Sequence, residues 1–130
     1  MSALVTQDFI WEDGHCTVMA RMADRPTAPN TAGTALTQAS FSSISYSVHD
    51  SSNVVVSGHD AQALTIASVV FDTLQGWSRD STGHNFRYTV AAGAFATGDS
   101  VYTITVKFTL TSGVVGYASY RVTTVAIPIS

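Results

Sequence analysis

The stretch Asp80–Val90, DSTGHNFRYTV, places an aspartate, a histidine and an asparagine within six positions. Side chains of these types can orient a catalytic base or ligate a metal ion. Asp and Asn also end strands, because their side chains accept hydrogen bonds from the backbone of a turn. The stretch is therefore either the edge of a site or the corner where the chain turns into a strand.

The histidines do not support a metal site. His15, His49, His59 and His84 fall in no HxH, HExxH or CxxC pairing, and each stands beside a Gly or an Asp. DSTGHN also lacks the alternating acidic positions of a calcium loop. The sequence predicts no metal ligands and no cofactor.

Nucleophilic catalysis is not indicated either. With 16 serines and four histidines, chance Ser/His pairs are expected and carry no information. There is no GxSxG motif and no paired set of carboxylates for glycoside hydrolysis. We therefore expect no catalytic residues, and a protein that is not an enzyme.

The corner interpretation gives each position in the stretch a structural role. Asp80 begins a turn, and Gly83 allows a backbone angle that other residues resist. His84 is expected to face solvent and Asn85 to bond loop backbone, while the apolar residues of the following strand enter the core. The predicted structural corner consists of Trp77, Asp80, Gly83, Asn85 and Phe86.

Composition indicates an all-β chain. Of 130 residues, 45% are hydrophobic and only 12% charged, and Ser and Thr together number 33. There is one Lys and one Glu, so good helix formers are scarce, whereas Val, Thr and Tyr favour strands. The surface must therefore be largely Ser and Thr.

Charge and cysteine content narrow the possible partners. The six basic residues are scattered and the net charge is −3, so no nucleic-acid partner is expected. The single cysteine, Cys16, cannot form an internal disulfide. No signal-like N-terminus and no run of about 20 apolar residues is present, so we expect neither export nor membrane insertion.

The clearest element is a strand over residues 100–110. Its apolar residues alternate strictly with polar ones, which is typical of a strand with one buried face. The predicted core positions are Tyr102, Ile104, Val106, Phe108 and Leu110. Residues 111–113 then form a turn, and residues 114–127 return as the second strand of a hairpin.

Shorter strands are predicted upstream, at residues 14–22, 42–50, 54–58 and 85–92, whereas residues 61–74 are ambiguous. About seven strands favour an Ig-like antiparallel β-sandwich, with a small jelly roll or barrel as the alternative. We expect one domain, in which residues 1–36 supply an N-terminal strand and an extended arm and residues 37–130 form the sandwich.

Two patterns in the last two thirds of the chain carry a resemblance. Trp77, Asp80, Gly83, Asn85 and Phe86 spell W..D..G.NF before a strand. The following hairpin contains Tyr102, Val106, Phe108, Thr109, Ser112 and Gly113. Together they resemble small Ig-like structural domains of tailed-bacteriophage virions.

The resemblance implies a non-enzymatic virion component made in the host cytoplasm, most simply a capsid decoration protein. Its partners would be major capsid or tail proteins, and it would form a homo-oligomer or occupy a lattice in many copies. The arm would contribute intersubunit contacts through Phe9, Trp11, Arg25, Pro26 and Pro29. The alternatives are a tail or baseplate adaptor, a fibre module, or a carbohydrate- or receptor-binding sandwich that uses loop aromatics such as Trp77.

Overall fold

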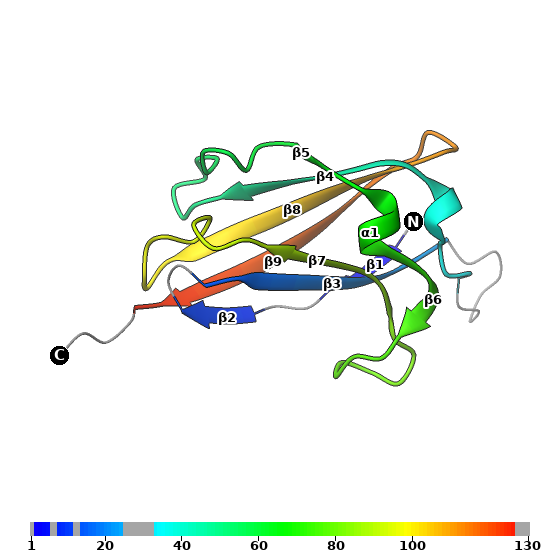
Figure 1. Ribbon diagram of the computed structural model, residues 1–130, viewed down its shortest axis with the longest axis horizontal. Helices are drawn as coiled ribbons and strands as arrows, with labels where there is room; N and C mark the ends of the chain where they lie inside the picture. The colour runs from blue at the N-terminus through cyan, green and yellow to red at the C-terminus, as the bar shows by residue number, and fades with distance from the viewer. Residues whose placement is uncertain (1, 6–7, 12–13, 25–32, 127–130) are drawn as a thin grey trace.

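In the computed structural model the chain folds into two β-sheets packed face to face (Figure 1). The structure describes residues 2–5, 8–11, 14–24 and 33–126. One sheet has four strands in the order β1-β3-β7-β6, and the other has five in the order β2-β9-β8-β4-β5. The strands are β1 (Ser2–Val5), β2 (Asp8–Trp11), β3 (Cys16–Ala23), β4 (Phe41–His49), β5 (Gln62–Leu64), β6 (Val70–Gln75), β7 (His84–Val90), β8 (Val101–Leu110) and β9 (Val115–Val125). Two short helical turns, η1 (Gln38–Ser40) and α1 (Ile66–Val69), complete the described elements.

The strand order confirms the all-β, Ig-like sandwich. Read as immunoglobulin strands, the four-stranded sheet is A-B-E-D, and the five-stranded sheet adds flanking strands to G-F-C. All neighbouring strands run antiparallel except β2 and β9, which pair in parallel. The two separate sheets exclude the barrel that the sequence left open, and the immunoglobulin strand order takes the place of the jelly-roll alternative.

The N-terminal region is part of the sandwich, so the predicted boundary at residue 36 is wrong. β3 lies between β1 and β7 in the four-stranded sheet, and it buries every second residue. β1 pairs with β3, whereas β2 pairs with β9 more than 100 residues later. Four-residue strands such as β1 and β2 are too short to show an alternation, and for that reason the sequence predicted an arm. Arg25, Pro26 and Pro29 lie outside the described residues.

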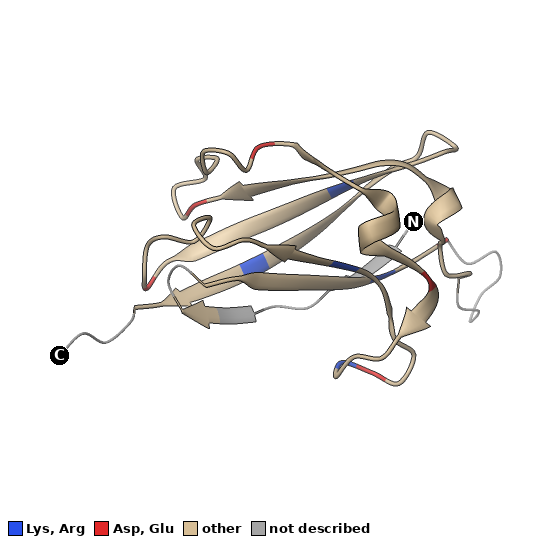
Figure 2. Ribbon diagram, viewed as in Figure 1, with Lys and Arg blue, Asp and Glu red and all other residues tan. Residues whose placement is uncertain are grey.

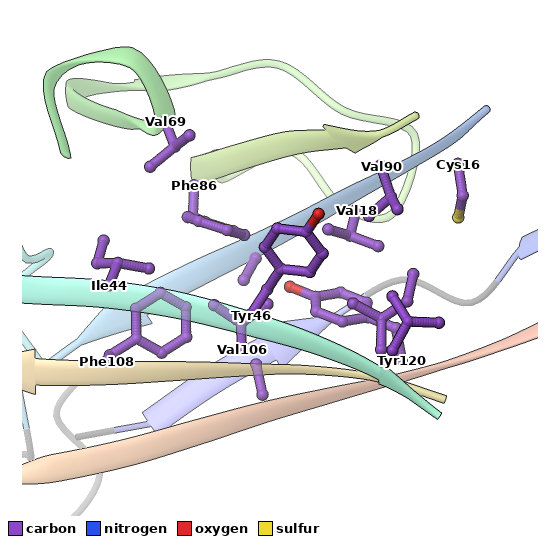
Figure 3. Packing of buried hydrophobic residues seen from close by; sticks show 14 of the residues in the cluster. Cys16, Val18, Ile44, Tyr46, Val69, Phe86, Val90, Val106, Phe108 and Tyr120 are labelled. Atoms are coloured by element: carbon purple, nitrogen blue, oxygen red, sulfur yellow. The ribbon is translucent and has the colours of Figure 1, made fainter. Parts of the chain in front are cut away.

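The predicted core strand is confirmed as β8. Its apolar residues are buried at alternate positions along the whole strand. Phe108 lies against Phe86 of β7, with ring centroids 5.2 Å apart, and against Phe41 of β4 at 5.8 Å. Figure 3 shows Phe86, Ile44 and Phe108 pointing into the space between the sheets. Full burial of a side chain of this size stabilises a fold by about 1.5–3 kcal/mol.

A tyrosine corner closes one end of the core without a disulfide. Tyr102 stands near the start of β8, and its hydroxyl accepts a hydrogen bond of 3.1 Å from the Thr97 backbone N–H. The Phe95 ring packs edge-on against Tyr102 at 5.3 Å. Immunoglobulin folds use this arrangement at the same corner. Cys16, the single cysteine of the sequence, is buried on β3, so no internal disulfide links the sheets and apolar packing holds this core together.

One upstream prediction is wrong, and one ambiguous segment is resolved. The valines of the predicted strand 54–58 form only an isolated bridge between Val55 and His49, and Val54 and Val55 are exposed. The turn Asp50–Asn53 directs this segment along the surface. The ambiguous stretch 61–74 resolves into β5, α1 and most of β6.

Candidate functional site

Asp80 organises the corner between β6 and β7. Its Oδ1 accepts hydrogen bonds from the Trp77 indole at 2.7 Å, the Thr82 N–H at 2.9 Å and the Gly83 N–H at 3.1 Å. Its Oδ2 is 2.6 Å from the Arg21 guanidinium of β3. The hydrogen bond from Trp77, followed by that from Gly83, holds the pKa of the Asp80 carboxyl far below its usual range. Both oxygens of the Asp80 carboxylate are therefore hydrogen-bonded to groups within the protein.

Gly83 has the backbone conformation that the sequence predicted. Its φ is +109°, a region that L-residues rarely adopt. A Cβ at this position would lie 2.5 Å from the Gln75 carbonyl oxygen. Glycine is therefore required here both by the turn and by the close approach of β6.

His84 is buried, so the expectation that it faces solvent is wrong. Only 2% of its surface is exposed, and its ring lies 5.6 Å from Trp77 and 5.9 Å from Phe71. Neither ring nitrogen has a hydrogen-bond partner of good geometry among the described residues. Burial, and then the charge of Arg87, lower the pKa of His84, and the Gln75 carbonyl opposes this only in part. Trp77, whose indole N–H is hydrogen-bonded to Asp80, covers the His84 ring.

Asn85 is a buried connector. Its side-chain oxygen accepts a bond from the Met22 N–H at 2.7 Å. Its amide donates to the Met22 carbonyl at 2.8 Å and to the Leu36 carbonyl at 2.9 Å. The side chain thereby ties β7 to the end of β3 and to the segment before η1. The sequence predicted bonding to backbone, but not these partners.

The corner consequently offers no catalytic arrangement. His84 contacts aromatic rings, whereas Asp80 and Asn85 use their oxygens on backbone, indole and guanidinium donors. In residues 14–24 and 33–126, no three His, Cys, Asp or Glu side chains converge as metal ligands. Outside the corner, the Tyr46 hydroxyl and His59 Nδ1 are hydrogen-bonded at 2.8 Å.

The outer face of the five-stranded sheet is polar and weakly charged. Cross-strand register aligns hydroxyl side chains of β4, β8 and β9 along this face: Ser43, Ser45, Ser47, Thr103, Thr105, Thr109, Ser119 and Thr123. Lys107 of β8 and Arg121 of β9 are the charged side chains among them. In Figure 2 blue positions interrupt β8 and β9, whereas most red positions lie in loops. The one ion pair among the described residues, Arg21–Asp80, is elsewhere.

Exposed apolar side chains gather at the β8–β9 hairpin. Val114, Val115 and Tyr117 are 49%, 44% and 61% exposed. The hairpin turn is closed by backbone hydrogen bonds: the Leu110 N–H donates to the Val114 carbonyl at 2.8 Å, and the Gly113 N–H donates to the Leu110 carbonyl at 2.9 Å. Gly113 has a positive φ of 92°, as the turn requires. We call Val114, Val115 and Tyr117 the hairpin patch.

A hollow of about 650 Å³ lies toward the other end of the same sheet face. The turn Asp50–Asn53 forms one rim, and β8 and β9 form the floor. The side chains that give it polar character are Asp50, Ser51, Asn53, Thr103, Ser119 and Arg121.

No family model and no curated protein matches the sequence. Among solved structures, the first Ig domain of mouse SynCAM 2 is similar, with 13% identity, a TM-score of 0.40 and 97% of each chain covered. The Ig-like assignment rests on the strand order described above. No helix in the described part of the chain is long and apolar enough to cross a membrane.

The predicted corner residues and the predicted arm residues thus have different outcomes. Trp77, Asp80 and Gly83 meet as predicted, and Phe86 enters the core. Trp11 lies on edge strand β2, 56% exposed, and Phe9 occupies the same strand. The sequence missed Arg21, the hairpin patch and the hollow. The alternation along residues 16–23 does place Arg21 outward, but it could not identify Asp80 as its partner.

Proposed function

We propose that this protein is a non-enzymatic structural component of a tailed-phage virion, which attaches to a lattice of capsid subunits through the hairpin patch. The exposed Val114, Val115 and Tyr117 on a hydrogen-bonded hairpin are the observation that carries the proposal. Exposed valines and a tyrosine that are held in place lose little conformational entropy on binding and exclude water well. The virion setting follows the resemblance of the corner and hairpin motifs.

The surface beside the patch supports protein docking. Thr109 lies across from Val115 in the cross-strand register, Ser43 lies across from Thr109 on the next strand, and Lys107 pairs with Tyr117. Hydroxyl groups lose less free energy on desolvation than ammonium groups, so Thr109 and Ser43 can be buried at low cost, whereas the long Lys107 side chain can keep its ammonium in water at the border. An apolar centre with a polar border is typical of protein interfaces.

The N-terminal region would contribute to docking through an edge strand rather than through an extended arm. β2 forms the edge of the five-stranded sheet, and Trp11 is exposed beside Val125 on its outer face. Trp11 therefore adds a second anchor for a neighbouring subunit. The deletion of residues 1–30 would remove three strands, so point substitutions are the better test.

The test uses particles of the phage whose genome encodes this chain, assembled after the gene for the chain has been deleted. Tagged protein is then mixed with these particles. We expect wild-type protein to co-sediment with the particles, and a triple variant, Val114→Ser, Val115→Ser and Tyr117→Ser, to remain in the supernatant. A matched control, Val54→Ser with Val55→Ser, removes exposed valines from a loop outside this hairpin and should still bind. Equal co-sedimentation of the hairpin variant would refute the docking role.

The number of bound copies separates the two virion assignments. A decoration protein should saturate at a number set by the capsid lattice, whereas a tail or baseplate adaptor should bind in few copies at one vertex. If wild-type protein does not bind particles at all, the virion assignment is wrong. Light scattering of the free protein gives its oligomeric state.

A further inference from the structure

Arg121 has an unused guanidinium on a rigid strand. It is exposed on β9, and among the described residues no acceptor lies within bonding distance of it. By contrast, Arg21 is paired with Asp80, and Arg87 lies over the Phe71 ring at 5.3 Å. A guanidinium presents donors in a planar fork that fits the two oxygens of a carboxylate. Arg121 is therefore free to bind one.

Two hydroxyl side chains stand next to Arg121 in register. Thr103 lies directly across from it in the β8–β9 ladder, and Ser119 precedes it by two residues on the same face. Directly opposed side chains on a sheet are about 5 Å apart, and second neighbours along a strand are about 6–7 Å apart. These spacings are comparable to the span of a six-membered sugar ring with its substituents.

The rim of the hollow is held in shape by the Asp50–Asn53 turn. Asp50 Oδ1 accepts bonds from the Ser52 N–H at 2.9 Å and the Val54 N–H at 3.0 Å. The Asn53 N–H donates to the Asp50 carbonyl at 2.9 Å, with Asn53 at a φ of 61°. Ser51 and Asn53 are thus presented to the hollow by a fixed turn, and this preorganisation reduces the entropy cost of binding.

We propose that this hollow binds a sugar acid, a ligand with one carboxylate and several hydroxyl groups. The carboxylate would accept two hydrogen bonds from the Arg121 guanidinium, flanked by the hydroxyls of Thr103 and Ser119. The ligand's own hydroxyls would form hydrogen bonds with the Asn53 side-chain amide and with the unused lone pairs of the Asp50 carboxylate. The volume of about 650 Å³ lies within the range of small-molecule sites and accommodates a monosaccharide.

Asp50 makes the site selective between ligand classes. Its negative charge on the rim opposes a bare anion, but accepts hydrogen bonds from hydroxyl groups. A neutral sugar can donate hydrogen bonds to Asp50, but it has no carboxylate for Arg121 to bind. Only a ligand that combines a carboxylate with hydroxyl groups matches both Arg121 on the floor and Asp50 on the rim.

The experiment titrates the ¹⁵N-labelled full chain with D-glucuronate and follows its amide resonances. Glucose, which lacks the carboxylate, and acetate, which lacks the hydroxyls, are the two control ligands. We expect glucuronate to shift the amides of Asn53, Thr103, Ser119 and Arg121 with a dissociation constant in the millimolar range. Glucose and acetate should shift them at least about tenfold more weakly at equal concentration, because glucose bonds only the Asp50 rim and acetate only Arg121 on the floor.

Matched substitutions then test the role of Arg121. Arg121→Gln should weaken glucuronate binding by about tenfold or more, and Arg121→Lys should weaken it less, since the charge remains but the fork is lost. Lys107→Gln removes the same charge from the same face outside the hollow, and should change binding by less than about twofold. Spectra of the free variants confirm that each is folded.

Three results would overturn the proposal. The first is that glucuronate causes no shifts at the hollow, and the second is that acetate binds there as well as glucuronate does. The third is that Arg121→Gln and Lys107→Gln weaken binding equally, which would indicate general electrostatic attraction. None of these outcomes bears on particle attachment through the hairpin patch.

Discussion

The corner at residues 77–85 and the outer face of the five-stranded sheet are both rich in polar side chains, but they use them differently. In the corner, Asp80 accepts four hydrogen bonds and Asn85 makes three, all within the protein. On the sheet face, Lys107 and Arg121 have no acid partner among the described residues, and of the aligned hydroxyl groups Ser47 accepts a bond from the Ala61 N–H, whereas Thr103, Thr105 and Ser119 make no side-chain hydrogen bond among those residues.

The contrast separates architecture from recognition. A polar group that is already satisfied stabilises the fold and has little left to offer a ligand. A polar group held rigidly without a partner retains its bonding capacity for a ligand or another protein. Residue types that suggest catalysis are in the corner, yet the available chemistry is on the sheet. Each of the following substitutions should therefore affect one region and spare the other.

The largest effect is expected for Phe86→Ala. Phe86 is fully buried beside Phe108, so its removal leaves a cavity between the sheets. The free energy of unfolding should fall by about 3–5 kcal/mol in chemical denaturation. A loss below about 1 kcal/mol would mean that the corner does not anchor β7 to the core.

Gly83→Val should come next. The new side chain would meet the Gln75 carbonyl oxygen and force a β-branched residue to a φ of +109°. We expect a loss of about 1–3 kcal/mol in the free energy of unfolding. Gly93→Val is the matched control, because Gly93 also has a positive φ but no atom near its Cβ position. Equal losses in the two variants would exclude a role for the close approach to β6.

The corner should also make stability depend on pH through His84. The folded-state pKa of His84 is lowered by burial, so the unfolded chain binds the proton more readily. This contribution to stability is complete above the unfolded-state pKa of about 6.5 and is lost as pH falls below it. His84→Phe keeps an aromatic ring between Trp77 and Phe71, and should remove this part of the pH dependence. Denaturation midpoints measured between pH 8 and pH 5, about the range over which His titrates, provide the test. An unchanged slope in the variant would contradict the assignment.

Asp80 also makes the stability of the fold decrease as pH falls, but it does so at lower pH than His84. Its folded-state pKa is depressed, so its contribution is present above the unfolded-state value of about 3.9 and is lost as pH falls further. Asp80→Asn should lower the denaturation midpoint at neutral pH, and the difference from wild type should shrink below about pH 4. A constant difference at all pH values would assign the loss to geometry rather than to charge.

The smallest effect is expected on the sheet face. Thr105 projects outward between Ser47 and Ser119 and has no structural hydrogen bond among the described side chains. Thr105→Ala should change the free energy of unfolding by less than about 0.5 kcal/mol. A larger loss would mean that the hydroxyl rows are also architecture, and the contrast between the two regions would disappear.

Local chemistry made much of the fold predictable. The five alternating apolar residues of β8 identified a strand with one buried face, and TSG identified its hairpin. Asp80 and Gly83 similarly identified the turn, because their preferences act over a few bonds. Where the local pattern was weak, the prediction was wrong: β1 and β2 were taken as an arm, and Val54–Gly58 as a strand.

The sequence by itself determined the all-β class, the buried faces of the long strands and the turn at Gly83. These follow from side-chain alternation and backbone preference, which depend on nearest neighbours in the chain. Only the tertiary structure decided that Arg21 meets Asp80 across 59 positions, that Trp77 covers His84, and that Arg121 stays unpaired. Such relations depend on which strands become neighbours, and alternation along one strand carries no information about its partner. The residues whose types suggested a catalytic or metal site thus stabilise the fold. The groups that remain available for binding are unpaired because of the way the strands pack.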